Sequence, residues 1–175
     1  REILSSELRS DCSILEGVVK GDSFELSKKL PTKCVDLLVL DPPYNLTKTF
    51  GKESFSSRSP EKYQCWIESY LKIIMPALKP TASIYVCGDW LSSASLFPAL
   101  DKYFKVRNRI TWEREKGRGS KTNWKNCSED IWYCTMGDEF KFYPERVRLR
   151  RKVLAPYKDS EGKPKDWVNK AGKKY

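Results

Sequence analysis

The sequence predicts an α/β fold in which a mostly parallel sheet is flanked by helices. Short apolar runs rich in β-branched residues alternate along the chain with segments of helical periodicity. This alternation is typical of βαβ units, in which a helix joins consecutive parallel strands. The run at residues 35–40, Val-Asp-Leu-Leu-Val-Leu, is almost continuously apolar, as expected of a central strand that is covered on both faces.

The N-terminal elements lead up to this central run. Residues 13–20 are expected to form a first strand. Asp22 or Ser23 then caps a short helix that ends at Leu30, since both residue types accept hydrogen bonds from the free N–H groups at a helix start. The central strand is expected to stop at residue 40, because two prolines follow closely and supply no ladder donors.

The remaining chain again alternates between helix and strand patterns. Residues 45–60 are polar and predict a mobile loop. The further elements are helices at 61–78 and 91–102 and strands at 83–88, 103–113 and 130–136. We expect residues 1–175 to form a single domain, because a chain of this length fills one hydrophobic core.

The charge of the chain is unevenly distributed. Lys plus Arg and Asp plus Glu number 13 and 13 in residues 1–104, but 20 and 10 in residues 105–175. A neutral part beside a basic part suggests a scaffold joined to a region that meets a polyanion; a basic surface that only improves solubility is the alternative. Residues 146–175 combine high charge with weak periodicity and predict a basic, weakly ordered tail.

The composition excludes several classes of protein. The chain contains no histidine, which excludes a Ser-His-Asp triad, a Cys-His pair and every zinc site that contains histidine, and we predict no metal site. Its six cysteines form no C-x-x-C pattern and are expected to be reduced core residues. No apolar run approaches the roughly 20 residues that cross a bilayer, so we expect a soluble, cytoplasmic protein. The first residue is not Met, which suggests part of a longer chain.

The sequence Asp41-Pro42-Pro43-Tyr44 directly follows the central strand, where ligands of open α/β sheets bind. The Asp41 carboxylate and the Pro42 carbonyl are both acceptors. Together they can hold the two N–H bonds of an exocyclic amino group and favour the positive charge that grows on it during attack. Pro42 and Pro43 make the backbone rigid, and Tyr44 offers a flat face for a base. A turn that only ends the strand is the alternative.

Asp-Pro-Pro-Tyr after an apolar strand, followed by Asn45-Leu46, resembles motif IV of the amino-methyltransferases of DNA. The resemblance covers roughly residues 14–140 and implies a Rossmann-like methyltransferase fold that is incomplete in this chain. It implies that Asp41 and Pro42 hold the target amino group and that Tyr44 stacks on a base rotated out of double-stranded DNA. An acidic first residue is typical of the family's N6-adenine enzymes, so adenine is the expected target.

The resemblance also implies S-adenosylmethionine as the methyl donor. Gly21 and Asp22 resemble the family's element that contacts the cofactor adenosine, with Asp41 beside them at the cofactor site; a capping role for Asp22 is an equally good interpretation. The segment at residues 113–128 corresponds to the one that meets DNA in this subgroup, and a solvated basic hairpin is its alternative. Its candidate DNA contacts are Arg114, Lys116, Arg118, Lys121, Trp124 and Lys125.

One departure from the family leaves other functions open. The F-x-G-x-G loop that holds the methionine part of the cofactor in this family does not occur in the sequence. The alternatives are a methyltransferase of the same fold that acts on cytosine N4, RNA or a protein amide, and a noncatalytic DNA-binding subunit or fragment. The sequence also leaves open the recognition site, membership of a restriction-modification system and formation of a homodimer.

Overall fold

The computed structural model describes residues 2–3, 17–50, 53–118, 121–122, 124, 126–147 and 160–161. Two compact units are distinguished, residues 1–141 and residues 142–175. The second unit contains a single turn of 3-10 helix, η3 (Pro144–Arg146), within the part described. Most of the predicted tail at 146–175 lies outside the described residues, so its order stays a prediction. The first unit holds the sheet and the helices.

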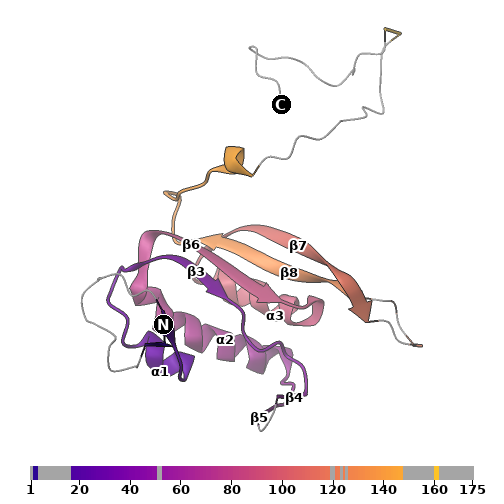
Figure 1. Ribbon diagram of the computed structural model, residues 1–175, viewed down its shortest axis with the longest axis horizontal. Coiled ribbons are helices and arrows are strands. Elements are labelled where there is room, and N and C mark those ends of the chain that lie inside the picture. The colour runs from indigo at the N-terminus through magenta and orange to yellow at the C-terminus, as the bar shows by residue number, and fades with distance from the viewer. Residues whose placement is uncertain are drawn as a thin grey trace. The chain divides into compact units, whose positions relative to one another are not determined.

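Four strands form the main sheet of the first unit (Figure 1). Their order across the sheet is β3 (Val35–Leu40), β6 (Leu78–Gly88), β8 (Asn126–Thr135) and β7 (Lys105–Arg118). β3 and β6 are parallel, whereas β8 is antiparallel to both β6 and β7. The α/β class is confirmed, but this sheet is mixed rather than mostly parallel, because β7 and β8 form a long antiparallel pair instead of a helical crossover.

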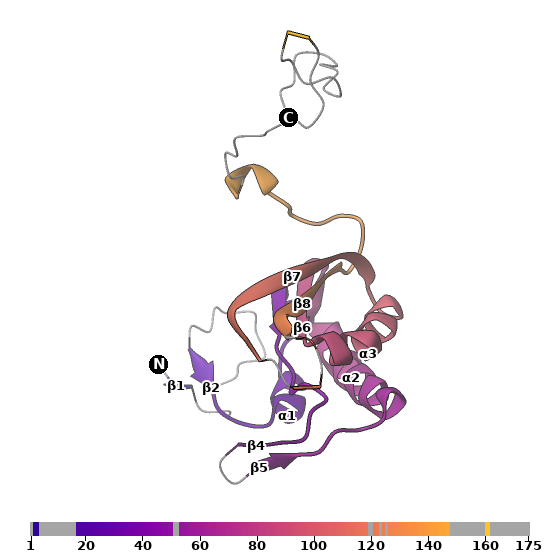
Figure 2. The same cartoon turned by 90° about the vertical axis from the view of Figure 1, so that its right-hand side faces the viewer.

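Helices α2 (Pro60–Ile74) and α3 (Trp90–Asp101) lie together on one side of the sheet (Figures 1 and 2). Each begins at a side chain that accepts a backbone N–H: Ser59 caps α2 and Asp89 caps α3. The predicted helix at 61–78 ends earlier than expected. A short 3-10 turn, η2 (Met75–Ala77), follows α2, and β6 already begins at Leu78.

The core lies between these helices and the sheet. Ile67 and Leu71 of α2, Leu96 of α3, and Ile84 and Val86 of β6 are each at most 1% exposed and belong to one cluster. The cluster explains the helical spacing of apolar residues in 61–78, which faces the sheet. The predicted helix at 22–30 is shorter than expected: α1 spans Ser23–Ser27, with Asp22 as its N-cap.

The opposite face of the sheet is apolar and open at its two outer strands, β3 and β7, whereas Tyr133 of β8 on the same face is buried. Leu37 and Val39 of β3 are 57% and 64% exposed, and Ile110 and Trp112 of β7 are 42% and 56% exposed. β3 also lies at the edge of the four-stranded sheet. The prediction of a central strand covered on both faces was therefore wrong for the part of the chain that the structure describes. Only one face of β3 packs against helices.

Two smaller pairs complete the first unit. β1 (Glu2–Ile3) runs parallel to β2 (Val18–Val19), and β4 (Lys48–Phe50) is antiparallel to β5 (Glu53–Phe55). The predicted loop at 45–60 thus contains a hairpin. Of the predicted strand at 13–20, the described part is confirmed only at β2.

Three predictions, on membrane spans, metal sites and cysteines, can be compared with the described residues. No helix among them is long and apolar enough to span a membrane, and no metal-binding cluster of Cys, Asp and Glu occurs among them. Of the five described cysteines, only Cys134 is fully buried, and Cys65 is exposed. The prediction of core cysteines was therefore wrong for Cys65, which lies on the solvent side of α2.

Candidate active site

A cavity of about 750 Å³ opens beyond the carboxyl end of β3. It brings together two sequence segments that are about twenty residues apart, Gly21-Asp22 and Asp41-Pro42-Pro43. The aromatic rings and aliphatic side chains on its wall come mainly from α1, β3 and α2. They are Phe24, Leu40, Trp66, Ile67 and Tyr70. The volume lies within the ordinary range of small-molecule sites.

Three contacts hold the backbone and side chains that follow Pro42. The Tyr63 hydroxyl donates to the Pro43 carbonyl at 3.0 Å. The Tyr44 hydroxyl donates to the Oε2 atom of Glu129 at 3.0 Å, and the Asn45 N–H donates to the Ser92 hydroxyl at 2.9 Å. Helix α2, strand β8 and helix α3 therefore each fix one residue of the turn.

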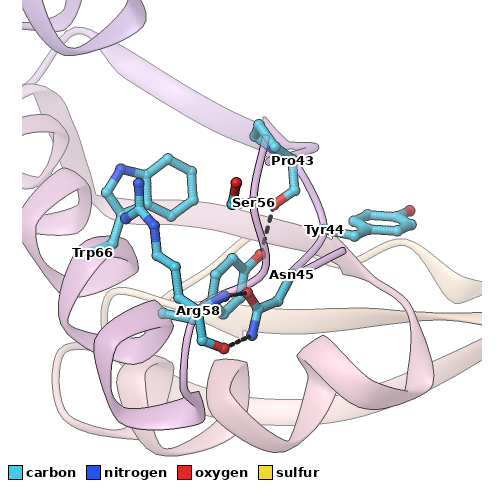
Figure 3. Close-up of a pocket in the computed structure, with 7 residues that line it drawn as sticks. Pro43, Tyr44, Asn45, Ser56, Arg58 and Trp66 are labelled. Atoms are coloured by element: carbon cyan, nitrogen blue, oxygen red, sulfur yellow. Dashed lines mark hydrogen bonds between the residues drawn. The ribbon is translucent and has the colours of Figure 1, made fainter. Parts of the chain in front are cut away.

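The Asn45 side chain also bonds to the backbone of Arg58, at the other end of the segment that contains the β4–β5 hairpin (Figure 3). Its Oδ1 atom accepts from the Arg58 N–H at 2.7 Å, and its Nδ2 atom donates to the Arg58 carbonyl at 2.8 Å. The Arg58 guanidinium lies 5.2 Å from the centre of the Trp66 ring, within cation–π range. A second, smaller cavity lies here, and it shares Pro43, Arg58 and Trp66 with the larger one.

Asp41 and Pro42 differ from the residues that follow them. Within the described part of the chain, neither the Asp41 carboxylate nor the Pro42 carbonyl takes part in a hydrogen bond or an ion pair. Asp41 is exposed, and both residues line the large cavity. Two acceptors therefore remain available to a bound group.

Burial and negative charge raise the pKa of two groups near Asp41. Burial raises the pKa of the Tyr44 hydroxyl above its usual value, and the bond to Glu129 and the charge of Asp41 raise it further. The pKa of the Cys87 thiol is raised by burial first and then by the charges of Asp41 and Glu129. Burial likewise raises the pKa of Tyr63 to about 12. Both tyrosines are neutral at physiological pH, and a cation formed beside Asp41 would be stabilised.

Asp22 caps a helix and also lines the large cavity. One carboxylate oxygen accepts from the Phe24 N–H at 2.7 Å and caps α1. The residue is nevertheless exposed and lines the large cavity beside Gly21. Capping is therefore confirmed, and a contact of Asp22 with a cofactor stays a prediction.

Of the predicted DNA-contacting residues, Arg114, Lys121 and Trp124 have described side chains, and none of these three lines the large cavity. Arg114 makes an ion pair with Glu129, with 2.7 Å between Nη1 and Oε1, so its guanidinium is engaged within the protein. Lys121 and Trp124 are exposed, Trp124 at 95%. Lys116 and Arg118 belong to β7, but their side chains, like all of Lys125, lie outside the described residues. Their contact with DNA stays a prediction.

Sequence reasoning missed Arg58, Trp66 and Glu129 as residues of the site. Trp66 lies in the segment that was predicted as the helix at 61–78, and Arg58 lies in the segment predicted as a loop. Glu129 is separated from Tyr44 by 85 residues. An Asn directly after Asp-Pro-Pro-Tyr was the one signal that the turn is tied to a neighbouring segment.

The relatives that comparison with known proteins finds include several methyltransferases. The chain is 28% identical over 148 residues to the type II methyltransferase M.BglII of Bacillus subtilis, covering 79% of this chain and 40% of that protein. It is 27% identical over 131 residues to the type II methyltransferase M.BamHI of Bacillus amyloliquefaciens, covering 74% and 31%. With the DNA adenine methyltransferase YhdJ of Escherichia coli K12, it shares 27% identity over 65% of this chain and 39% of that protein. The chain thus spans less than half the length of these relatives.

Solved structures share the fold at lower identity. The PvuII DNA methyltransferase, described as cytosine-N4-specific, superposes with a TM-score of 0.58 at 21% identity, over 73% of this chain and 51% of that one. A DNA modification methylase of Thermus thermophilus, described as putative and solved with S-adenosyl-L-methionine, gives a TM-score of 0.52 at 17% identity, over 74% and 58%. The Rossmann-like methyltransferase fold class is thereby confirmed. The sequence profile of the DNA methylases that modify N6 or N4 amino groups matches residues 35–175, and the chain belongs to this DNA methylase family.

Proposed function

We propose that the protein transfers a methyl group from S-adenosylmethionine to the N6 amino group of an adenine in double-stranded DNA. The observation that carries the proposal is the pairing of two free acceptors, Asp41 and Pro42, on the wall of the large cavity. Family membership supports amino-group methylation, and the carboxylate at position 41 supports adenine.

The residues at the cavity fit the methyl donor. S-adenosylmethionine supplies an electrophilic methyl group when bound. Its adenine ring suits the aromatic wall around Phe24 and Trp66, and its ribose hydroxyls or amino groups suit an acceptor such as Asp22. The cavity is large enough for a ligand of that size.

Asp41 and Pro42 act on the nucleophile. An exocyclic amine is a poor nucleophile, because its lone pair is delocalised into the base. Two acceptors fixed in space hold both N–H bonds and favour the pyramidal nitrogen that attacks the methyl carbon. A new N–C bond forms as the donor's S–C bond breaks. The donor's sulfur keeps the electron pair of that bond and leaves as a neutral thioether. The nitrogen becomes positively charged, would be stabilised by the Asp41 carboxylate, and then gives its proton to water.

The target base has to leave the duplex to reach these acceptors, because its amino group is inaccessible inside the stack. Tyr44 is adjacent to the acceptors and offers its ring as a stacking surface. The basic residues of 113–128 supply phosphate contacts that bring the duplex to the site.

A direct assay tests the proposal. The full-length protein, double-stranded DNA and methyl-labelled S-adenosylmethionine are incubated, and the DNA is digested to nucleosides. We expect label in N6-methyladenine. Label solely in N4-methylcytosine would replace adenine by the second candidate, which the family also includes, and label solely in protein would overturn DNA as the substrate.

The role of Asp41 has a matched control on the strand that precedes it. Asp41→Ala should lower kcat by at least roughly a thousandfold, because it removes one of two fixed acceptors. Asp36→Ala removes an exposed carboxylate of β3 that pairs with Lys79 at the surface, and it should leave kcat within about twofold. Equal losses in both variants would contradict a chemical role for Asp41.

A further inference from the structure

Glu129 connects the candidate active site to the strand that carries the basic segment. Its Oε2 atom accepts from the Tyr44 hydroxyl at 3.0 Å, and its Oε1 atom lies 2.7 Å from Nη1 of Arg114. The Glu129 side chain is only 14% exposed, whereas that of Arg114 is 40% exposed. Both carboxylate oxygens are therefore engaged, one by the turn after β3 and one by β7.

The three residues come from separate stretches of chain that the sheet aligns. Glu129 lies on β8 opposite Trp112 of β7, and Arg114 follows two residues later on β7. Tyr44 comes from the turn beyond β3, two strands away in the sheet. Without Glu129, the Tyr44 ring could turn about its first side-chain bond, because Glu129 is the one hydrogen-bond partner of its hydroxyl among the described residues.

We propose that Glu129 is a positioning residue of the methyl-transfer site, which fixes the Tyr44 ring for stacking against the target base while Arg114 holds the carboxylate in place. The inference rests on the proposed function of the site. It assigns Glu129 a role that acts through Tyr44 and not on the reacting atoms. It also gives Arg114 a role within the site in place of a free phosphate contact.

A carboxylate suits both neighbours of Glu129. The Arg114 guanidinium can only donate, the Tyr44 hydroxyl donates in this structure, and an ionised Glu accepts at both oxygens. A glutamine could keep both hydrogen bonds, because its oxygen can accept from Arg114 while its NH2 group donates to the Tyr44 hydroxyl, which can also accept. Glu129→Gln therefore removes the negative charge beside Tyr44 while leaving the size of the side chain unchanged.

The test is a double-mutant cycle in the full-length protein. Tyr44→Phe and Glu129→Ala should each lower kcat roughly tenfold, the scale of one charge-assisted hydrogen bond, with little change in KM for S-adenosylmethionine. The double variant should be no slower than the slower single variant, because both changes remove the same contact. Target-site 2-aminopurine fluorescence should report a lower fraction of stacked, extruded base in all three.

Two further variants separate positioning from general damage. Glu139→Gln changes an exposed carboxylate just beyond β8 and should leave kcat unchanged. Glu129→Gln should lower the pKa of Tyr44, because it removes a negative neighbour that disfavours phenolate; the 13C resonance of the Tyr44 ring, assigned with Tyr44→Phe, measures this shift without catalysis. Glu139→Gln should not move that resonance.

The outcomes distinguish this inference from the proposed function. Losses in kcat that multiply in the double variant, or a Tyr44 resonance that ignores Glu129→Gln, would overturn the positioning role while wild-type methylation of adenine still stands. A wild-type protein that methylates no amino group would refute the proposed function itself, and the positioning role with it.

Discussion

The two faces of the main sheet differ in what covers them. On the helix side, Ile84 and Val86 of β6 are 0% exposed and pack against α2 and α3. The opposite face of the sheet also carries apolar residues, but two of them, Leu37 and Val39 of β3, are more than half exposed. Tyr85 on that side is covered mainly by its neighbour in the sheet, Tyr133, at 4.8 Å between ring centres.

This difference shows that apolar composition and burial are separate properties of a strand. Burial of apolar surface stabilises a fold in proportion to the area removed from water. Residues of one type in the core on the helix side and on the open face should therefore contribute very differently to the free energy of unfolding. Matched pairs of substitutions measure that difference directly.

The largest contrast is expected for leucine. Leu71→Ala removes a fully buried side chain of α2 from the core and should cost about 2–5 kcal/mol in the free energy of unfolding, since it adds a cavity to the lost transfer energy. Leu37→Ala, on the open face, should cost less than about 1 kcal/mol. Urea denaturation followed by circular dichroism measures both. A loss above about 2 kcal/mol at Leu37 would mean that this face is covered in the full-length protein.

Valine gives a smaller contrast with almost no change in shape. Val86→Thr places a hydroxyl in the core and should cost about 1–3 kcal/mol, because the hydroxyl loses its bonds to water. Val39→Thr on the adjacent strand keeps the hydroxyl in water and should change stability by less than about 0.5 kcal/mol. The difference in midpoint of urea unfolding is the measurement. Equal midpoints would contradict the assignment of the two faces.

The same two faces show what the sequence predicted and what it did not. Asp22 as a helix cap, the strand at 35–40 and the placement of Asp41 beyond it follow from local rules of capping, apolar runs and proline. Local rules do not report which strand is at an edge. The apolar run at 35–40 predicted two covered faces, since the side chains of Leu37 and Val39 carry no sign of what packs on them.

Local sequence rules also could not predict contacts between residues on different strands of the sheet. The bond between Tyr44 and Glu129 depends on the position of β8 in the sheet, which follows from its antiparallel pairing with β6 and β7. Strand direction leaves no mark in a two-residue periodicity. The sequence carried one weak signal for the β4–β5 hairpin, the Gly51-Lys52 pair between Phe50 and Glu53. The polar composition of the segment favoured the prediction of a loop instead.

The smallest change in the free energy of unfolding is expected for the N-cap of α3, the helix that contacts Asn45 of the candidate site. The Asp89 carboxylate accepts from the Ser92 N–H at 2.8 Å and caps α3, and the Ser92 hydroxyl in turn accepts from the Asn45 N–H. Asp89→Ala should cost about 1 kcal/mol, the usual contribution of an N-cap. Asp101→Ala, at the other end of α3, should be neutral or slightly stabilising, because a negative charge there opposes the helix dipole.

Hydrogen exchange extends this comparison to the candidate active site. If α3 supports the turn through Ser92, Asp89→Ala should speed hydrogen exchange of the Asn45 amide and of the amides in the first turn of α3. The amides of β7 should keep their exchange rates. Because the link is one hydrogen bond, the change in the Asn45 rate should stay within roughly tenfold. An Asn45 amide that exchanges at the wild-type rate in Asp89→Ala would show that α2 and β8 hold the turn without the help of α3.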